Sequence, residues 1–172
     1  MKSRVTPAQT IGPFFHGALC GPGDGRLAEP GSPGALELRG QVLDGLHEPV
    51  EDALLELWQT DGRVSAFARA ATDSAGEYLV VARKLPGAKL ADGRRQAPHI
   101  NVSLFARGLL HRLVTRIYFP DEAAANARDP LLASIADPRL RARLVAQPDA
   151  NGAGLRFDVV LQGERETPFL DV

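Results

Sequence analysis

The sequence has a single cysteine, Cys20, and no long hydrophobic run. One cysteine excludes an internal disulfide and a thiolate metal cluster. The lack of a membrane-length apolar run argues against a transmembrane helix, and the first residues, Met1 to Pro7, lack the apolar core of a signal peptide. We therefore expect a cytoplasmic protein.

A surplus of charge of either sign is also missing. The chain has 20 Lys and Arg against 21 Asp and Glu, which gives a formal net charge of −1. Such a chain has no strong field to attract nucleic acid or an anionic membrane, so neither is an expected partner. Hydrophobic residues make up 44% of the chain, which is ordinary for a soluble globular protein with a real core.

Glycine and proline are plentiful, with 17 and 13 residues, as expected for many turns between short strands. The length of 172 residues fits one domain, with an arm and loop in 1–34 and a β-sandwich in 35–172. Two prolines and a glycine exclude a helix between Thr6 and His16, yet Ile11 and the phenylalanines after it need burial. This arm therefore lies extended, either on its own domain or on a partner.

Short apolar runs, each ended by a turn signal, predict the strands. Asp44-Gly45 and Asp61-Gly62 are strong turn signals because glycine takes positive φ without strain. The expected strands are 35–43, 53–59, 77–85, 97–108, 111–119 and 155–162, with a further short one in 63–69. This pattern predicts a mainly β protein, a single-domain β-sandwich.

Helices are expected only in one short insertion near 121–146. Asp121 to Asn126 favours helix, with acidic residues at its start where the helix dipole stabilises them. Asp129-Pro130 and Asp137-Pro138 each combine an aspartate N-cap with proline at the first helical position. These pairs predict two short helices, around 131–135 and 139–145.

The strand from Ala97 to Gly108 has two different faces, because side chains alternate along a strand. One face is apolar and consists of Ile100, Val102, Leu104 and Ala106. The opposite face carries imidazole, amide, hydroxyl and guanidinium groups, on His99, Asn101, Ser103, Phe105 and Arg107. This polar row suits the wall of a pocket or an oligomer interface, and a solvated face is the alternative.

Four pieces of the sequence resemble the intradiol ring-cleaving dioxygenases. They are Thr6 to Pro13, Glu56 to Gln59, Pro98 to Gly108, and Thr115 to Phe119 with the helix that follows. Within them, His99-Ile100-Asn101 is similar to the His-x-His strand that supplies two ferric-iron ligands in that family, beside two tyrosines. The resemblance implies an intradiol dioxygenase-like β-sandwich that works as the alpha chain of an alpha–beta hetero-oligomer, in which both chains share one fold.

By this resemblance, one of four iron-ligand positions is kept. The two tyrosine positions hold Val64 and Ala88-Lys89, and the second histidine position holds Asn101. Ferric iron is a hard cation that needs several anionic or imidazole donors, so His99 alone makes no iron site. We expect no metal ligand and no catalytic residue in this chain. His99 is then an interface or core histidine, and the non-haem ferric iron is held by the beta subunit.

The resemblance also implies a contribution to the partner's pocket. It places Thr10, Gly12 and Pro13 of the arm on the wall of the beta subunit's substrate pocket, and Arg107 near the substrate carboxylate. A guanidinium suits that task because its planar fork matches a carboxylate. Simple arm geometry and a plain interface ion pair are the alternatives for these residues.

The implied reaction is the O2-dependent intradiol cleavage of 3,4-dihydroxybenzoate to 3-carboxy-cis,cis-muconate, a step of the β-ketoadipate pathway. Two alternatives stay open. A stand-alone β-sandwich binding or scaffold module is one, although a scaffold has no reason to keep Thr10 to Pro13. A self-sufficient intradiol enzyme with unusual ligands is the other, and the missing tyrosines argue against it, because Tyr78 and Tyr118 lie inside predicted strands.

Overall fold

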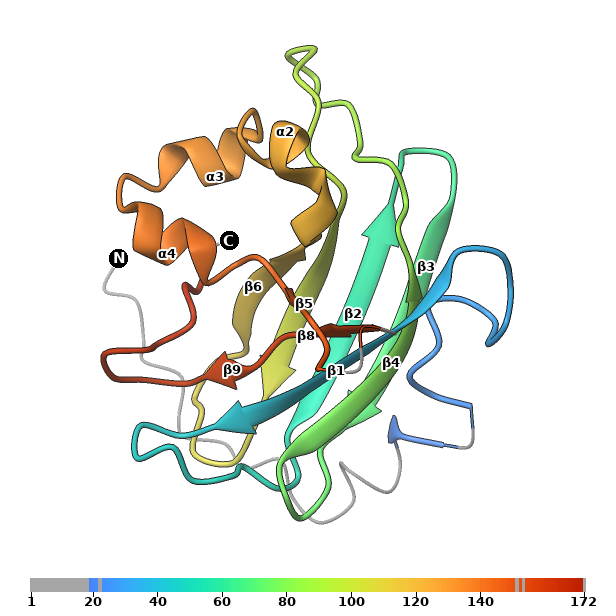
Figure 1. Ribbon diagram of the computed structural model, residues 1–172. Coiled ribbons are helices and arrows are strands. Elements are labelled where there is room, and N and C mark those ends of the chain that lie inside the picture. Colours follow the sequence, from blue (N-terminus) through green and yellow to red (C-terminus); the bar gives the residue numbers. More distant parts are fainter. Residues whose placement is uncertain (1–18, 22, 151, 153, 172) are drawn as a thin grey trace, which may run out of the picture.

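The computed structural model describes residues 19–21, 23–150, 152 and 154–171, which form mainly two β-sheets (Figure 1). One sheet has the strand order β4-β1-β8-β7, with β9 also pairing β1, and the other has the order β3-β2-β5-β6. The strands are β1 Ala35–Leu43, β2 Leu54–Thr60, β3 Ser65–Ala71, β4 Glu77–Arg83, β5 His99–Phe105, β6 Leu113–Tyr118, β7 Gln147–Pro148, β8 Gly154–Arg156 and β9 Val159–Val160. The helical segments are η1 Pro120–Glu122, α2 Ala123–Asn126, α3 Pro130–Ser134 and α4 Pro138–Ala142.

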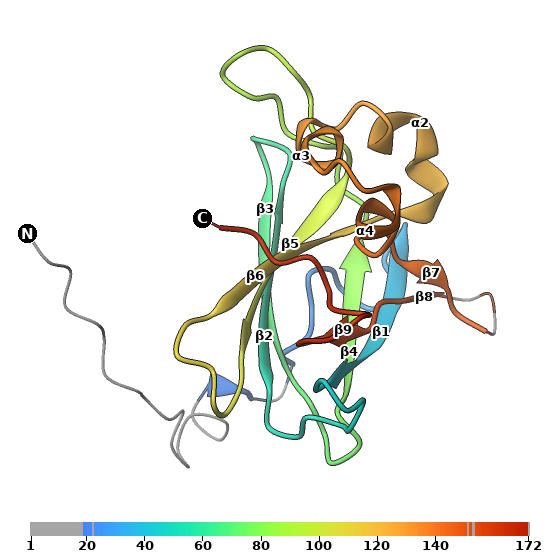
Figure 2. The same cartoon turned by 90° about the vertical axis from the view of Figure 1, so that its left-hand side faces the viewer.

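The hydrophobic core lies between the two sheets, which form two facing layers (Figure 2). Alternate residues of the long strands point into it, and Ile100, Val102 and Leu104 of β5 are at most 1% exposed. This burial removes their apolar surface from water, which is the main force that holds the layers together. The mainly β sandwich and the apolar face of the central strand are confirmed.

The long C-terminal strand predicted for 155–162 is wrong, because the chain forms two short strands there, β8 and β9. Both pair with β1 in the same parallel register, and the break falls at Phe157 and Asp158. At the break, side chains provide hydrogen bonds. The Tyr78 hydroxyl donates to Phe157 O at 2.6 Å, and the Gln41 backbone N–H donates to Asp158 Oδ1 at 3.0 Å. The other predicted strands are present, with ends that differ by up to three residues.

The helical insertion forms where it was predicted and covers one end of the sandwich (Figure 1). Asp129 caps α3 by accepting hydrogen bonds from two backbone N–H groups, and Asp137 caps α4 by accepting from Arg139 N–H at 2.8 Å. Both helices begin at the proline that follows the cap. The helix α4 ends at Ala142, earlier than the predicted residue 145.

Asp129 also ties the insertion to the sandwich, and it is fully buried. Besides the α3 backbone, its carboxylate accepts from the Tyr118 hydroxyl at 2.9 Å and from Ala97 N–H at 2.8 Å. These donors offset the cost of burying a carboxylate. As a result, the start of β5, where His99 lies, is held against the end of β6.

The remaining expectations concern a membrane-spanning helix, the N-terminal arm and the single cysteine. No helix in the described ranges is long and apolar enough to cross a membrane. The arm predicted from Thr6 to His16 lies outside the described residues. Cys20 is half-buried, and burial raises the pKa of its thiol, so the thiol stays protonated at neutral pH.

Candidate functional site

The candidate site lies on the outer face of the β3-β2-β5-β6 sheet, the face turned away from the core. The strand register places four side chains in one row across this face: Phe67, Trp58, Asn101 and Arg116. Trp58 is 44% exposed and Phe67 is 54% exposed. Two neighbouring aromatic side chains are therefore both open to solvent. Exposed apolar patches of this kind mark interaction surfaces.

His99, the residue that the sequence analysis matched to a family iron ligand, is only 9% exposed. Its Nδ1 lies 2.8 Å from Ala97 O, which favours the tautomer with the proton on Nδ1. Its ring centroid lies 5.6 Å from that of Tyr118. Burial lowers the pKa of the imidazole, and the positive charge of Arg116 lowers it further. His99 is therefore neutral near pH 7.

Arg116 reaches the same place from β6. Its Nε donates to Asn101 Oδ1 at 3.0 Å. When the Gln96 carboxamide is oriented so that its oxygen accepts, the two terminal nitrogens of Arg116 donate to it at 2.9 and 3.2 Å. A permanent cation therefore stands beside both His99 and Asn101.

The side chains at this place do not fit ferric iron. Asn101 offers a neutral amide oxygen that already accepts from Arg116. The two positions that the sequence analysis matched to tyrosine ligands hold Val64 and Lys89, which have no anionic oxygen. Across the part of the chain that the structure describes, no group of three or more His, Cys, Asp and Glu residues could hold a metal ion. The guanidinium charge would also repel a metal cation placed next to His99.

Neither tyrosine supplies a missing ligand. Tyr118 lies close to His99, nearer than its place in the sequence indicated, but its hydroxyl donates to the buried carboxylate of Asp129. Tyr78 belongs to the other sheet, where its hydroxyl donates to Phe157 O. Burial raises the pKa of both phenols, so neither is a tyrosinate at neutral pH.

Arg107 lies beyond the opposite end of β5 from His99. Its side chain is 65% exposed and forms ion pairs with Asp52 at 2.8 Å and Glu51 at 3.5 Å. All three residues line a cleft of about 600 Å³. Eight residue steps of about 3.3 Å separate His99 from Arg107. The polar row predicted from the sequence therefore does not form a single site, because His99 and Arg107 lie at its opposite ends.

The remaining predicted pocket residues, Thr10, Gly12 and Pro13, lie outside the described residues. Arg116 is the residue that the sequence prediction missed. A signal for it was present, because Thr115 and Ile117 face the core and residue 116 must then face outward. Recognising that it meets Asn101 also required the exact register of the β5–β6 pair.

The two facing sheets form a β-sandwich of the intradiol dioxygenase type. Similar solved structures include the dioxygenase domain of a dioxygenase–carbohydrate-binding protein fusion from Streptomyces sp. SirexAA-E, with 26% identity, 91% of this chain and 97% of that chain covered, and a TM-score of 0.58. Hydroxyquinol 1,2-dioxygenase from Pseudomonas putida DLL-E4 is 19% identical, with a TM-score of 0.60. That match covers 93% of this chain and 67% of the hydroxyquinol dioxygenase chain. No family model matches the sequence.

Sequence relatives are more specific than the structures. The chain is 41% identical to the protocatechuate 3,4-dioxygenase alpha chain of Pseudomonas putida over 96% of both chains, and 40% identical to that of Burkholderia cepacia over 98% of both. The chain thus belongs to the family of protocatechuate 3,4-dioxygenase alpha chains. The Burkholderia cepacia beta chain is also similar, with 30% identity over 77% of this chain and 66% of the beta chain. These relatives do not favour a stand-alone scaffold.

Proposed function

We propose that this chain is the iron-free alpha subunit of a cytoplasmic protocatechuate 3,4-dioxygenase and completes the substrate pocket of an iron-bearing beta subunit. The complex cleaves 3,4-dihydroxybenzoate (protocatechuate) with O2 to 3-carboxy-cis,cis-muconate, in the β-ketoadipate pathway of aromatic degradation. The observation that carries the proposal is the Arg116 guanidinium, which lies beside the lone His99 and hydrogen-bonds Asn101. A chain of this family with a fixed cation at that place needs a partner to bring the iron.

The partner docks on the outer face of the β3-β2-β5-β6 sheet. Trp58 and Phe67 expose apolar area there, and the Arg69 guanidinium lies 5.2 Å from the centroid of the Phe67 ring while it pairs with Glu56 at 2.9 Å. Aromatic residues and arginine are the types enriched at the centres of protein interfaces. Because alpha and beta chains are both relatives of this chain, a second sandwich of the same fold is the occupant that we assign.

Arg107 binds the substrate carboxylate, and Thr10, Gly12 and Pro13 form part of the pocket wall. The exposure of the Arg107 side chain supports this role, because a guanidinium in solvent can reach into a neighbouring chain. The ion pair between the Arg107 Nε and Asp52 at 2.8 Å helps to fix the direction of the side chain. The terminal amino groups keep donors for a carboxylate, since the contact to Glu51 is long at 3.5 Å.

Iron content and visible absorption test the proposal, first on this chain alone and then on the chain assembled with its beta subunit. We expect the lone chain to be colourless and free of iron. The complex should hold about one iron per alpha–beta pair. Stoichiometric iron together with ring cleavage in the lone chain would contradict the proposal.

Replacing Arg107 tests its role in the complex. We expect Arg107→Ala to raise the KM for 3,4-dihydroxybenzoate by about tenfold or more, because a hydrogen bond to a charged group contributes about 1.5–3 kcal/mol. Arg107→Lys keeps the charge without the planar fork and should be intermediate. Iron content and assembly should persist in both variants. An unchanged KM would leave Arg107 with only its ion pairs to Asp52 and Glu51.

A further inference from the structure

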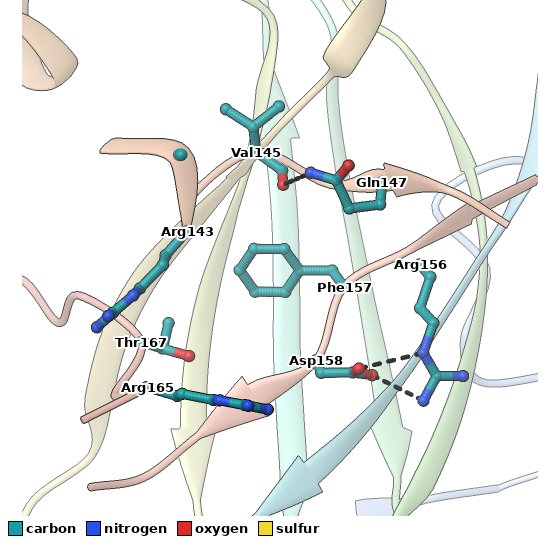
Figure 3. Close-up of a pocket in the computed structure, with 9 residues that line it drawn as sticks. Arg143, Val145, Gln147, Arg156, Phe157, Asp158, Arg165 and Thr167 are labelled. Atoms are coloured by element: carbon teal, nitrogen blue, oxygen red, sulfur yellow. Dashed lines mark hydrogen bonds and ion pairs between the residues drawn. The ribbon is translucent and has the colours of Figure 1, made fainter. Parts of the chain in front are cut away.

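A basic pocket of about 240 Å³ lies where the end of α4, strands β7 and β8, and the C-terminal tail meet (Figure 3). Three arginines line it, Arg143, Arg156 and Arg165, against a single carboxylate, Asp158. The formal charges of these four side chains give the lining a charge of +2. The proposed function uses none of these residues.

Only one of the three arginines is neutralised by a carboxylate. Arg156 forms a two-point ion pair with Asp158, at 2.9 and 3.1 Å. Arg143 donates to the backbone carbonyl of Glu166 at 3.1 Å, which satisfies one donor and leaves the charge. Arg165 is exposed and has no hydrogen bond or ion pair to any residue that the structure describes. Each guanidinium carries five N–H donors, so Arg143 and Arg165 have several left for a ligand.

The pocket also has an apolar wall and a buried hydroxyl. Phe157 is 4% exposed, and its ring lies at the centre of the close-up, with Arg143 to one side and the Arg156–Asp158 pair to the other (Figure 3). Thr167 is 3% exposed, and its Oγ1 accepts from Val160 N–H at 2.9 Å, so its own proton remains to be donated. An apolar surface with a few convergent polar groups is typical of a site for a small organic ligand.

We propose that this pocket binds a small polycarboxylate, namely the product of the ring cleavage, and this identification rests on the proposed function. Cleavage breaks the carbon–carbon bond between the two hydroxyl-bearing carbons, and each of these carbons gains one oxygen atom of O2 and becomes a carboxylate. The two hydroxyl protons are released as the new acids ionise. The product therefore carries three carboxylates where the substrate carries one. The two guanidinium groups without a carboxylate partner, on Arg143 and Arg165, select for such an ion, because each can bind one carboxylate through two parallel hydrogen bonds.

Calorimetric titration of the alpha–beta complex with tricarballylate, an unreactive tricarboxylate, tests the pocket in phosphate-free buffer. We expect one binding site per alpha chain. Arg143→Gln and Arg165→Gln should each weaken binding by about tenfold or more, because each removes a charge-assisted pair. Arg128→Gln is the matched control, since Arg128 is an exposed arginine outside the pocket, and it should bind as the wild type does.

Absence of tricarballylate binding, or binding that both pocket variants keep, would overturn the inference. Acetate and inorganic phosphate are titrated as further probes, and phosphate affinity equal to that of tricarballylate would refute the polycarboxylate ligand. Cleavage of 3,4-dihydroxybenzoate is measured on the same wild-type complex. A complex that cleaves the substrate without binding tricarballylate refutes the pocket alone, whereas one that binds tricarballylate without cleavage supports the pocket and refutes the proposed function.

Discussion

At the scale of single residues, the contacts of His99 are those of a buried structural histidine. Ala97 O orients its ring, Tyr118 packs beside it, and Arg116 adds a positive charge nearby. Burial and that charge both favour a neutral imidazole. The positive charge beside His99 is therefore that of the Arg116 guanidinium, and its hydrogen bond to Asn101 provides a partner for both half-buried side chains.

Stability should fall in mild acid because of His99. Its pKa is lower in the folded protein than the ordinary value of 6.5, so the unfolded chain binds more protons as the pH falls through about 6.5. The free energy of unfolding should decrease from there until the pH reaches the folded-state pKa. Urea denaturation between pH 7.5 and pH 5 measures the effect. His99→Gln should flatten this part of the curve, whereas His111→Gln, at an exposed position, should not.

Arg116→Gln should raise the pKa of His99, because the substitution removes a neighbouring positive charge. NMR titration of the His99 ring protons measures this pKa directly. The same variant should then lose less stability in acid than the wild type does, because its folded-state pKa lies closer to the unfolded value of about 6.5. Arg112→Gln, at an exposed position, serves as the control. A His99 pKa that does not respond to Arg116→Gln would remove the guanidinium from our account of the site.

At the scale of elements, local sequence was enough for most strands and for both capped helices. Alternation identifies β5, and the aspartate-proline pairs identify α3 and α4, because these signals lie within a few residues of each other. The break between β8 and β9 depends on Tyr78 and Gln41, which lie on other strands. No local pattern carries that information, and the same holds for the meeting of Arg116 with Asn101.

A substitution at Gly40 of β1 tests the break between β8 and β9, because the backbone at residue 40 lies close to Phe157. An added Cβ at residue 40 would overlap Phe157 O and lie 2.6 Å from the Tyr78 hydroxyl oxygen, the two partners of one hydrogen bond. We expect Gly40→Ala to lower the free energy of unfolding by about 1–3 kcal/mol, the usual cost of overpacking. Urea denaturation measures it against Gly21→Ala, where no atom lies within 4 Å of the new Cβ. Equal stability of the two variants would contradict this account.

At the scale of the whole molecule, the two sheets of the sandwich present different outer faces. The outer face of the β3-β2-β5-β6 sheet joins exposed Trp58 and Phe67 to the polar pair Asn101 and Arg116. On the other sheet, Leu79 of β4 is 42% exposed. Assembly through the first face would bury the aromatic pair together with Asn101 and Arg116. The single domain 1–172 stays a prediction, because the arm lies outside the described residues.

Phe67→Ala should therefore weaken the alpha–beta complex while it leaves the fold of this chain intact. Phe67 is 54% exposed in the isolated chain, so its truncation removes little core packing, but a buried aromatic anchor in an interface commonly contributes about 2 kcal/mol or more. We expect the dissociation constant, measured by sedimentation with the beta subunit, to rise by about tenfold or more. Leu79→Ala is the matched control, because it truncates an exposed apolar side chain on the other sheet. If Leu79→Ala weakened the complex and Phe67→Ala did not, the beta subunit would dock on the β4 side of the sandwich.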